Sequence, residues 1–377
     1  MTTSPLANPT ATRELLEEFG LATKHRLGQN FLIDNHVIER ICELSELAGD
    51  ERVLEVGPGV GTLTLALLQE AACVTSIEAD PELEPVLDAH AADYANFRFI
   101  MGDALRVTPE QIEQAAGGEP TVFVANLPYN VAATIILQFF QTMPALRRAV
   151  VMVQKEVADR IAATPGNKTY GGYTAKLGLY AQVTGRFEVP PRCFMPAPHV
   201  DSAVVRIDRV DGVVPEGLDR EFVACVIDAA FAQRRKTIRN SMSANGFAKD
   251  VLDAAFEACG IASTTRAETL DVADMVLQNA QAAFQAGVAG VDQRVGVLPR
   301  PDQLLHLPVV GLGGELKGDF SGHHPPQGAV MGHLEGQVLM LHPVLHHHFG
   351  DVVAGAGDII VAAALAAVDL KGLILAV

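Results

Sequence analysis

Residues 122–130 read Val-Phe-Val-Ala-Asn-Leu-Pro-Tyr-Asn, an apolar run that stops abruptly at a polar and aromatic tetrapeptide. The run has the composition of a buried β-strand, and Asn126, Leu127, Pro128 and Tyr129 follow at its carboxyl end. In open α/β sheets, ligands bind outside the carboxyl ends of the strands. The sequence therefore predicts that this tetrapeptide lies at the ligand-binding edge of a sheet.

The tetrapeptide combines hydrogen-bond acceptors with a flat ring. Pro128 has no N–H and disfavours a helical conformation at Leu127, so the backbone carbonyls stay available as acceptors. Asn126 adds a side-chain carbonyl, and the ring of Tyr129 offers a surface on which a base could stack. Acceptors converging on one amino group beside a ring suit adenine N6 or cytosine N4. The alternative is an ordinary strand followed by an Asn-Leu-Pro turn.

A glycine loop follows an earlier predicted strand. The strand over residues 52–55 runs into Gly57, Gly59 and Gly61, and then into a helix predicted over residues 62–72. Glycines between a strand and a helix let the backbone approach a nucleotide-type ligand closely. A lone glycine pattern is weak evidence, but this context strengthens it.

Acidic residues follow the next two predicted strands. The strand over residues 74–77 ends at Glu78, whose carboxylate can bind the two hydroxyls of a ribose; the alternative is a simple surface acid. The strand over residues 97–101 precedes Asp103, which can accept from an adenine amino group, and Ala104, which is small enough to let the ring lie flat. Successive strands thus end in the parts of one nucleotide site.

The N-terminal part has two open interpretations. Residues 1–20 are expected to be a disordered or helical lead-in, with disorder over about the first ten. The glycine-broken stretch 24–34 is either an ordinary lead-in or a lid over a cofactor that Asn30 and Leu32 touch. Periodicity also predicts helices over residues 11–19, 131–142 and 156–163, a helix-like run ending near residue 47, and strands over residues 149–153, 187–190 and 204–207.

Composition limits the possible partners. The chain of 377 residues is 49% hydrophobic with a formal net charge of -17, which argues for two globular domains and against binding nucleic acid over the whole surface. The five scattered cysteines indicate neither a disulfide framework nor a structural zinc site. The first thirty residues contain no apolar signal segment, and we expect a cytoplasmic protein without membrane contact.

The C-terminal part contains a basic cluster and a tail. Residues 218–284 have helical periodicity and carry the cations Arg234, Arg235, Lys236 and Arg239. A charge run is usually a solvated face, but the contrast with the acidic chain favours a phosphate-binding patch for RNA. The histidines within residues 342–348 lack matching carboxylates or cysteines, so we expect no metal site there.

Taken together, these motifs resemble the ribosomal RNA adenine dimethylase family within the class I S-adenosylmethionine methyltransferases. Members carry Gly-Gln-Asn-Phe-Leu, Glu-Val-Gly-Pro-Gly-x-Gly-x-Leu-Thr and Asn-Leu-Pro-Tyr, which occur here at residues 28–32, 55–64 and 126–129. The resemblance continues through residues 152–160, 170–173 and 194–202, and it covers roughly residues 24–274.

The resemblance implies an α/β fold with a Rossmann-like methyltransferase sheet at residues 21–212 and a small all-helical RNA-binding domain at residues 213–285. Residues 286–377 form a tail outside the family, which we expect to be disordered or artefactual. The implied methyl donor is S-adenosylmethionine, and no metal is required. The implied cofactor-binding residues are Asn30, Leu32, Gly57, Gly59, Gly61, Glu78, Asp103, Ala104 and Asn126.

The same resemblance implies a catalytic set of Asn126, Leu127, Pro128, Tyr129 and Phe194. Tyr129 and Phe194 would sandwich an adenine flipped out of its helix. The carbonyls of Asn126 and Leu127 would aim its amino group at the sulfonium methyl, so catalysis would consist mostly of orientation and electrostatic preorganisation.

The leading hypothesis is dimethylation of two adjacent adenines near the 3′ end of small-subunit (16S) rRNA during ribosome biogenesis. The expected partner is that rRNA or an immature small ribosomal subunit, bound by a monomer. One alternative is methylation of large-subunit rRNA by a related enzyme, and another is an assembly factor for which methylation is secondary. A DNA amino-methylating enzyme is disfavoured, because the acidic body offers little to hold a duplex.

Overall fold

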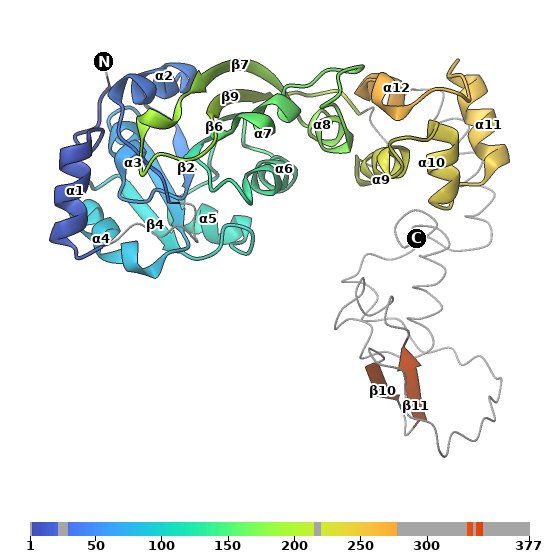
Figure 1. Ribbon diagram of the computed structural model, residues 1–377. Helices are drawn as coiled ribbons and strands as arrows, with labels where there is room; N and C mark the ends of the chain where they lie inside the picture. Colours follow the sequence, from blue (N-terminus) through green and yellow to red (C-terminus); the bar gives the residue numbers. More distant parts are fainter. Residues whose placement is uncertain (1, 22–28, 215–219, 277–329, 335–336, 342–377) are drawn as a thin grey trace. The chain divides into compact units, whose positions relative to one another are not determined.

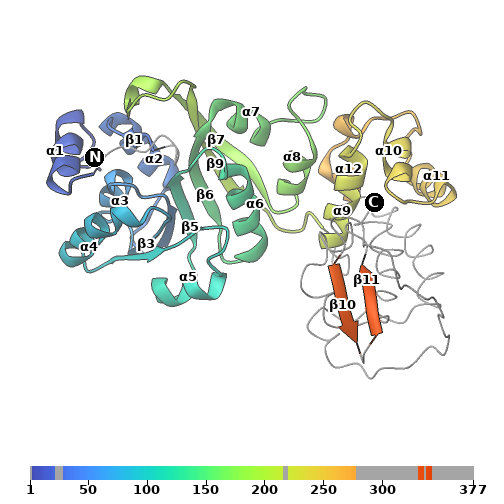
Figure 2. The same ribbon diagram turned by 60° about the horizontal axis from the view of Figure 1, so that its bottom comes forward.

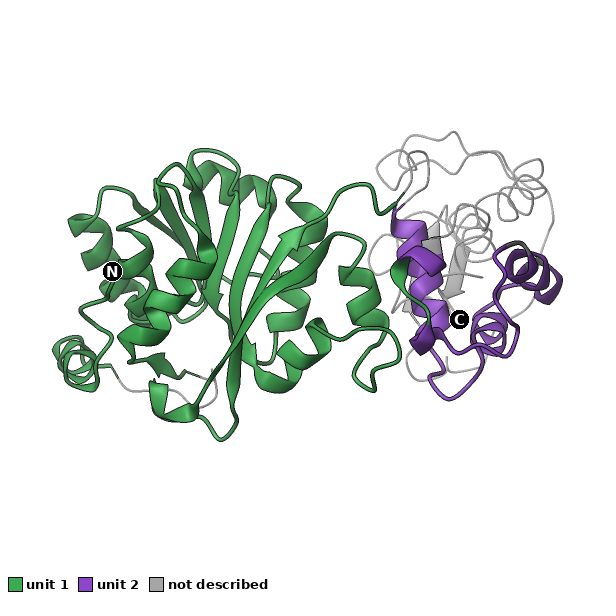
Figure 3. Ribbon diagram, turned by 90° about the horizontal axis from the view of Figure 1, so that it is seen from above, with its two compact units in different colours: residues 1–217, 270–272 green, residues 218–269, 273–377 purple. Residues whose placement is uncertain are grey.

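The computed structural model describes residues 2–21, 29–214, 220–276, 330–334 and 337–341. The chain divides into two compact units, Met1–Gly217 with Leu270–Val272, and Leu218–Thr269 with Ala273–Val377 (Figure 3). The first unit thus extends a few residues beyond the end expected at residue 212 and includes a short return segment.

A seven-stranded sheet forms the centre of the first unit (Figure 1). Its strands lie in the order β4-β3-β2-β5-β6-β9-β7, in which neighbours from β4 to β6 are parallel and β9 is antiparallel to both β6 and β7. The strands are β2 (Arg52–Val56), β3 (Cys73–Glu78), β4 (Phe97–Met101), β5 (Val122–Asn126), β6 (Arg148–Gln154), β7 (Ala181–Val189) and β9 (Ser202–Arg209). All the strands predicted from the sequence are present, and β7 begins earlier than expected.

Helices cover both faces of this sheet, with α2, α3 and α4 on one face and α6 and α7 on the other (Figure 2). Their apolar side chains and those of the strands form one buried core cluster, which includes Ile38, Leu67 and Leu87 of the helices and Val74 and Val124 of the strands. The helical elements of this unit are α1 (Pro9–Glu18), α2 (Asn35–Ser45), α3 (Thr62–Leu67), η2 (Pro81–Leu83), α4 (Glu84–Asp93), α5 (Pro109–Ala116), α6 (Ala132–Thr142), α7 (Lys155–Ile161), α8 (Gly172–Leu177) and η3 (Pro191–Cys193).

Two expectations for local structure were wrong. The helix predicted over residues 62–72 ends at Leu67. The second wrong expectation is disorder over about the first ten residues. Tertiary contacts order them, since Leu6 is buried and the Ser4 backbone N–H donates to Asn35 Oδ1 at 2.8 Å. The lead-in is therefore helical and packed, because its few apolar residues join the core of the sheet unit.

The stretch interpreted as a lead-in or a lid contains a short strand, β1 (Phe31–Leu32). It pairs antiparallel with β8 (Phe194–Met195), so that Leu32 lies opposite Phe194. This pairing fixes the described end of the stretch on the sheet unit, while residues 22–28 lie outside the described residues.

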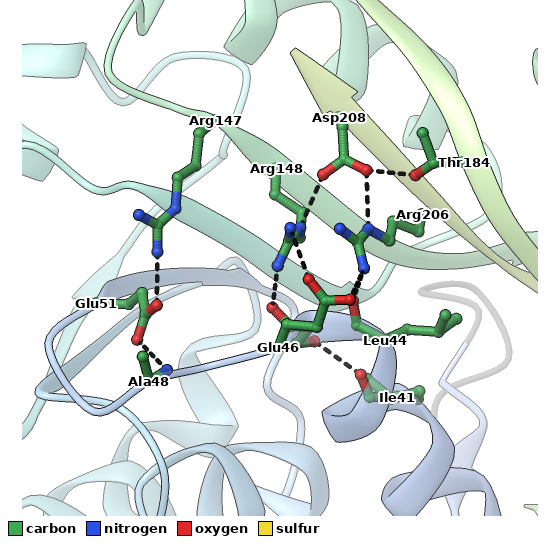
Figure 4. Close-up of polar contacts among 11 residues, drawn as sticks. Ile41, Leu44, Glu46, Ala48, Glu51, Arg147, Arg148, Thr184, Arg206 and Asp208 are labelled. Carbon is green, nitrogen blue, oxygen red and sulfur yellow. Dashed lines mark hydrogen bonds and ion pairs between the residues drawn. The ribbon is translucent and has the colours of Figure 1, made fainter.

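An ion-pair network joins the end of α2 to the strands β6 and β9 (Figure 4). Asp208 accepts from Arg148 and Arg206, each at 2.8 Å, and from the Thr184 hydroxyl. Glu46, just after the helix, contacts the same two guanidinium groups. The network therefore anchors the helix at the edge of the sheet opposite to the predicted ligand edge.

Within residues 220–276, all the described elements are helical, as the periodicity predicts. They are α9 (Arg220–Phe231), α10 (Ile238–Ala244), α11 (Lys249–Ala258) and η4 (Ala267–Thr269), and α12 (Val272–Val276) spans the division between the units. Of the tail, only the antiparallel strands β10 (Val330–Leu334) and β11 (Gln337–Leu341) are described. The histidines of residues 342–348 lie outside the described residues.

Candidate active site

A cavity of about 250 Å³ opens where the strand order reverses between β2 and β5. Ligands of open α/β sheets bind at such a switch point, because the loops from the two halves diverge there. The cavity is lined by residues 29–32, Glu55, residues 57–59, Thr62, Leu63, residues 78–80, Leu83, Asp103 and residues 126–131. The structure thus brings most of the predicted site residues to one place.

The glycine loop has the backbone that the sequence predicts. Gly59 lines the cavity with a φ of 60°, and a Cβ there would lie 3.0 Å from the Phe31 ring. Gly61 adopts a φ of 88° and is not among the lining residues. A Cβ on Gly61 would lie 2.7 Å from His90 Nε2, which donates to the Val60 carbonyl at 3.0 Å. Gly61 therefore shapes the loop, and direct cofactor contact by it stays a prediction.

The two predicted acids lie at different depths around the cavity. Glu78 is buried, and its two carboxylate oxygens accept from the backbone N–H groups of Gly59 at 3.2 Å and Asp80 at 2.9 Å. These bonds orient the carboxylate, while burial raises its pKa. Asp103 also lines the cavity and is exposed, whereas Ala104 is buried and does not line it.

The Asn-Leu-Pro-Tyr turn is held by backbone bonds. The Leu127 N–H donates to the Met152 carbonyl at 3.0 Å, and the Pro128 carbonyl accepts from Ala132 at the start of α6 at 3.1 Å. The side-chain N–H of Asn126 donates to the Asn30 backbone carbonyl at 3.4 Å. The side-chain oxygen of Asn126 therefore points away from the Asn30 carbonyl. The use of the Asn126 and Leu127 carbonyls as acceptors for the target amino group stays a prediction.

The two predicted stacking rings differ in exposure. Tyr129 lines the cavity, and its hydroxyl lies 2.7 Å from that of Ser202. Phe194 is only 3% exposed, pairs with Leu32 and is not among the lining residues. A sandwich of a base between Tyr129 and Phe194 would require the Phe194 ring to leave this packing, and it stays a prediction.

Several lining residues were missed by the sequence reasoning. Glu55 was interpreted as part of an apolar strand, although it is a lone acid at a strand end. Gln29 donates to Asp80 at 2.7 Å, and both residues line the cavity. The Thr62 hydroxyl is buried beside the cavity and has no hydrogen-bond partner among the described residues. A ligand with polar groups fits this lining, since an unsatisfied buried hydroxyl is costly unless something bonds it.

Burial perturbs the carboxyl group of Glu55, which lines the cavity. It is 1% exposed, and its Oε2 accepts from the hydroxyls of Thr64 and Ser76, each at 2.7 Å. Burial raises its pKa to about 7, and the nearby Glu78 acts in the same direction, whereas the two hydroxyls oppose the shift. A cofactor in the cavity would thus meet a carboxyl group that titrates near neutral pH.

The four predicted RNA-binding cations belong to the second unit, and the structure separates them into two pairs. Arg239 donates two bonds to Asp253, at 2.5 and 2.6 Å, and Arg234 contacts Glu268 at 3.5 Å. Arg235 and Lys236 are exposed and form no ion pair within the described residues. Phosphate binding by these cations stays a prediction.

Metal ligands and membrane spans were searched among the described residues. No group of three or more histidine, cysteine, aspartate or glutamate side chains is placed to hold a metal there. No described helix is both long and apolar enough to cross a membrane.

The fold and the cavity together define a class I methyltransferase: a mostly parallel sheet, a glycine loop after β2, an acid at the end of β3, and Asn-Leu-Pro-Tyr beginning at the end of β5. Residues 20–282 match the family described as ribosomal RNA adenine dimethylase. The chain belongs to this family.

Curated relatives agree with this assignment. A protein of Thermobifida fusca named ribosomal RNA small subunit methyltransferase A is 40% identical over 274 residues, which cover 71% of this chain and 93% of the relative. A protein of Rhodococcus erythropolis with the same name is 43% identical over 279 residues, which cover 72% of this chain and 92% of the relative.

Solved structures support the fold. A dimethyladenosine transferase from Plasmodium falciparum superposes with a TM-score of 0.57 at 24% identity, covering 67% of this chain and 98% of that one. The 23S rRNA methyltransferase ErmE superposes with a TM-score of 0.54 at 27% identity, covering 68% of this chain and 100% of that one.

Proposed function

We propose that this chain catalyses S-adenosylmethionine-dependent N6,N6-dimethylation of two adjacent adenines near the 3′ end of small-subunit (16S) rRNA. The observation that carries the proposal is that relatives named for small-subunit rRNA methylation match it over more than nine-tenths of their own length, at 40 and 43% identity. The cavity beside Asn126 and Tyr129 supports the same chemistry.

The cofactor would occupy the cavity between the glycine loop and the Asn-Leu-Pro-Tyr turn. When bound, S-adenosylmethionine would supply a methyl carbon on its sulfonium, which the target amino nitrogen could attack in line; the methyl–sulfur bond would break and S-adenosylhomocysteine would leave. Glu78 is oriented by two backbone N–H groups and would accept from the ribose hydroxyls. Asp103 would accept from the cofactor's adenine amino group at the exposed rim. Asn30 and Leu32 would close the opposite side.

The chain's own part in the chemistry is orientation. Asn126 and the Leu127 carbonyl would accept from the target amino group, which localises its lone pair and aims it at the methyl. Holding two reactants in such a geometry can remove about 7–11 kcal/mol from a barrier. Asn126 is a neutral acceptor and no strong base, so the proton would leave to water after transfer.

The decisive experiment measures transfer of labelled methyl from S-adenosylmethionine to immature small subunits, with nucleoside analysis of the product. We expect dimethyladenosine in the small-subunit RNA. Asn126→Ala should lower kcat by roughly 100-fold or more, as loss of one preorganised group at a reaction centre does elsewhere. Asn96→Ala is the matched control, because its amide binds the Leu68 and Ala71 carbonyls and it does not line the cavity.

A second candidate is methylation of large-subunit rRNA, which the structural likeness to a 23S rRNA methyltransferase favours. Label in free large-subunit RNA and none in small subunits would establish it and contradict the leading proposal. No label in either RNA, with binding intact, would instead favour an assembly factor. We further propose that the chain acts as a monomer on the immature particle in the cytoplasm. Sedimentation of the purified chain would test its monomeric state.

A further inference from the structure

The hydroxyl of Tyr129 has one partner in the described part of the chain, and it lies far away in sequence. Ser202 Oγ is 2.7 Å from Tyr129 Oη, across a separation of 73 residues. Ser202 belongs to the stretch of residues 194–202 that resembles the family, but neither the motif chemistry nor the proposed mechanism gives it a role. Ser202 has no other side-chain hydrogen bond among the described residues.

Ser202 is a rigid anchor. It is 0% exposed and begins β9, where it pairs with Gln154 of β6 on one side and with Val189 of β7 on the other. A residue held by two neighbouring strands cannot move without disturbing the sheet. The Ser202 hydroxyl therefore offers a fixed point near the carboxyl end of β6, next to β5.

Tyr129, in contrast, is not held by strand pairing. It lies in the turn between β5 and α6, outside both elements, and it lines the cavity. A ring attached only through its Cα–Cβ bond can rotate between rotamers, whereas a second attachment at the para position fixes the ring axis. Burial raises the pKa of the Tyr129 hydroxyl, and the Ser202 bond opposes this shift.

We propose that Ser202 is a positioning residue for methyl transfer: its hydroxyl fixes the ring of Tyr129 in the plane on which the target adenine stacks. This inference rests on the proposed function. A stacked base adopts the plane of the ring beneath it, so the ring's angle sets the direction in which the adenine amino group points. Stacking alone needs only a phenyl ring, and the hydroxyl then serves to hold its angle.

The test is a double-mutant cycle with Ser202→Ala, Tyr129→Phe and the combined variant, assayed on immature small subunits. Each single variant removes one of the two bonded hydroxyls and keeps an aromatic ring at position 129. We expect each to lower kcat about 5- to 20-fold, consistent with an orientation effect on one group. The combined variant should be no slower than the slower single variant, because both changes remove the same contact. S-adenosylhomocysteine affinity, measured by calorimetry, should change less than about twofold, because the hydroxyl bond acts on the target base.

Ser45→Ala is the matched control. Ser45 is also 0% exposed in the same unit, and its hydroxyl donates to the Ile41 carbonyl at 2.7 Å within α2. This variant should lose stability with kcat unchanged, which separates a loss of fold from a loss of positioning. A crystal structure of Ser202→Ala should show the Tyr129 ring in more than one orientation.

Two outcomes would overturn the proposal while leaving the proposed function intact. One is an active wild-type enzyme whose Ser202→Ala variant keeps wild-type kcat. The other is a combined variant whose loss is the product of the two single losses. Failure of the proposed function would look different, since the wild-type chain itself would then transfer no methyl to small subunits.

Discussion

Glu55 and Glu51 are two buried glutamates of the sheet unit whose surroundings act in opposite directions. Glu55 accepts only from two hydroxyls, and burial raises its pKa to about 7. Glu51 is also buried, which alone would raise its pKa, but the N–H groups of Ala48 and Gly49 and the Arg147 guanidinium lower it overall. Ionisation of the carboxyl group thus costs stability at Glu55 and adds stability at Glu51.

Replacing Glu55 by Gln should make the cofactor-free protein more stable at alkaline pH. The folded-state pKa lies above the reference value of 4.5, so the native carboxyl binds its proton more tightly, and ionisation costs stability as the pH rises from about 4.5 to 7. Glutamine avoids this cost and still accepts from both hydroxyls. We expect a gain of about 3 kcal/mol in the free energy of unfolding at pH 8, vanishing near pH 4.5. Urea denaturation across this pH range measures it.

Glu51→Gln is the control with the opposite sign. Its lowered pKa means that the ionised form stabilises the fold above the reference pKa, and that this contribution is lost as the pH falls through the folded-state pKa. The variant should therefore be less stable than wild type at pH 8. If both variants shifted stability in the same direction at pH 8, the opposition inferred from the structure would be wrong.

At the scale of elements, helix α2 is held at its carboxyl end by arginines from the strands. Arg148 donates to the Ser45 carbonyl at 2.8 Å, and Arg206 donates to the Leu44 carbonyl at 3.3 Å. The last carbonyls of a helix lack partners within the helix and interact favourably with cations. Asp208 holds both guanidinium groups in place, as Figure 4 shows.

Asp208→Ala should destabilise the sheet unit by about 2 kcal/mol, because two partly buried arginines lose the less exposed of their two shared carboxylates. Burial alone would raise the pKa of Asp208, but bonds from Thr184, Arg148 and Arg206 lower it. Its contribution should therefore be present at neutral pH and fade as the pH falls through the lowered pKa. Thermal unfolding at pH 7 and pH 3 measures both effects.

Asp159→Ala serves as the comparison for this prediction. Asp159 pairs with Arg186 at 2.5 Å, and the two side chains are 40 and 31% exposed. Exposed pairs contribute little, since water and salt screen them. A loss for Asp159→Ala as large as that for Asp208→Ala would show that burial of the network is not what makes it stabilising.

At the scale of the whole molecule, an acidic chain must bind a polyanion through few residues. Of the four predicted RNA-binding cations, Arg235 and Lys236 are exposed without an ion pair among described residues, whereas Arg239 is engaged by Asp253. A guanidinium already bound by a carboxylate gains less from a phosphate. The pair Arg235 and Lys236 should therefore account for more of the electrostatic contact than Arg239.

The double variant Arg235→Ala/Lys236→Ala should weaken RNA binding and lower the salt dependence of the affinity. Each phosphate contact contributes roughly one unit to the slope of log K against log salt concentration, so a decrease of about 2 is expected. Filter binding to small-subunit rRNA over a range of KCl concentrations measures the slope. Arg239→Ala, the matched single-charge variant, should change it by less than about 1. An unchanged slope in the double variant would contradict phosphate binding by this pair.

The sequence by itself determined the order of the fold. Strands, glycine loop and the Asn-Leu-Pro-Tyr turn were predicted because each is a contiguous pattern of burial and backbone preference. The acid after β3 followed from the same logic, since parallel strands bring their carboxyl ends to one edge. The sequence did not determine where helices end, because nothing local in residues 62–72 shows that α3 stops at Leu67.

Only the tertiary structure decided how the site is held. Three features depend on residues that are distant along the chain: the pairing of β1 with β8, the bond from Tyr129 to Ser202, and the packing that buries Phe194. A sequence carries no periodic signal for such contacts. The raised pKa of Glu55 belongs here too. Its cause is the removal of a carboxylate from water by surrounding elements, and that environment exists only after the sheet and its helices have packed.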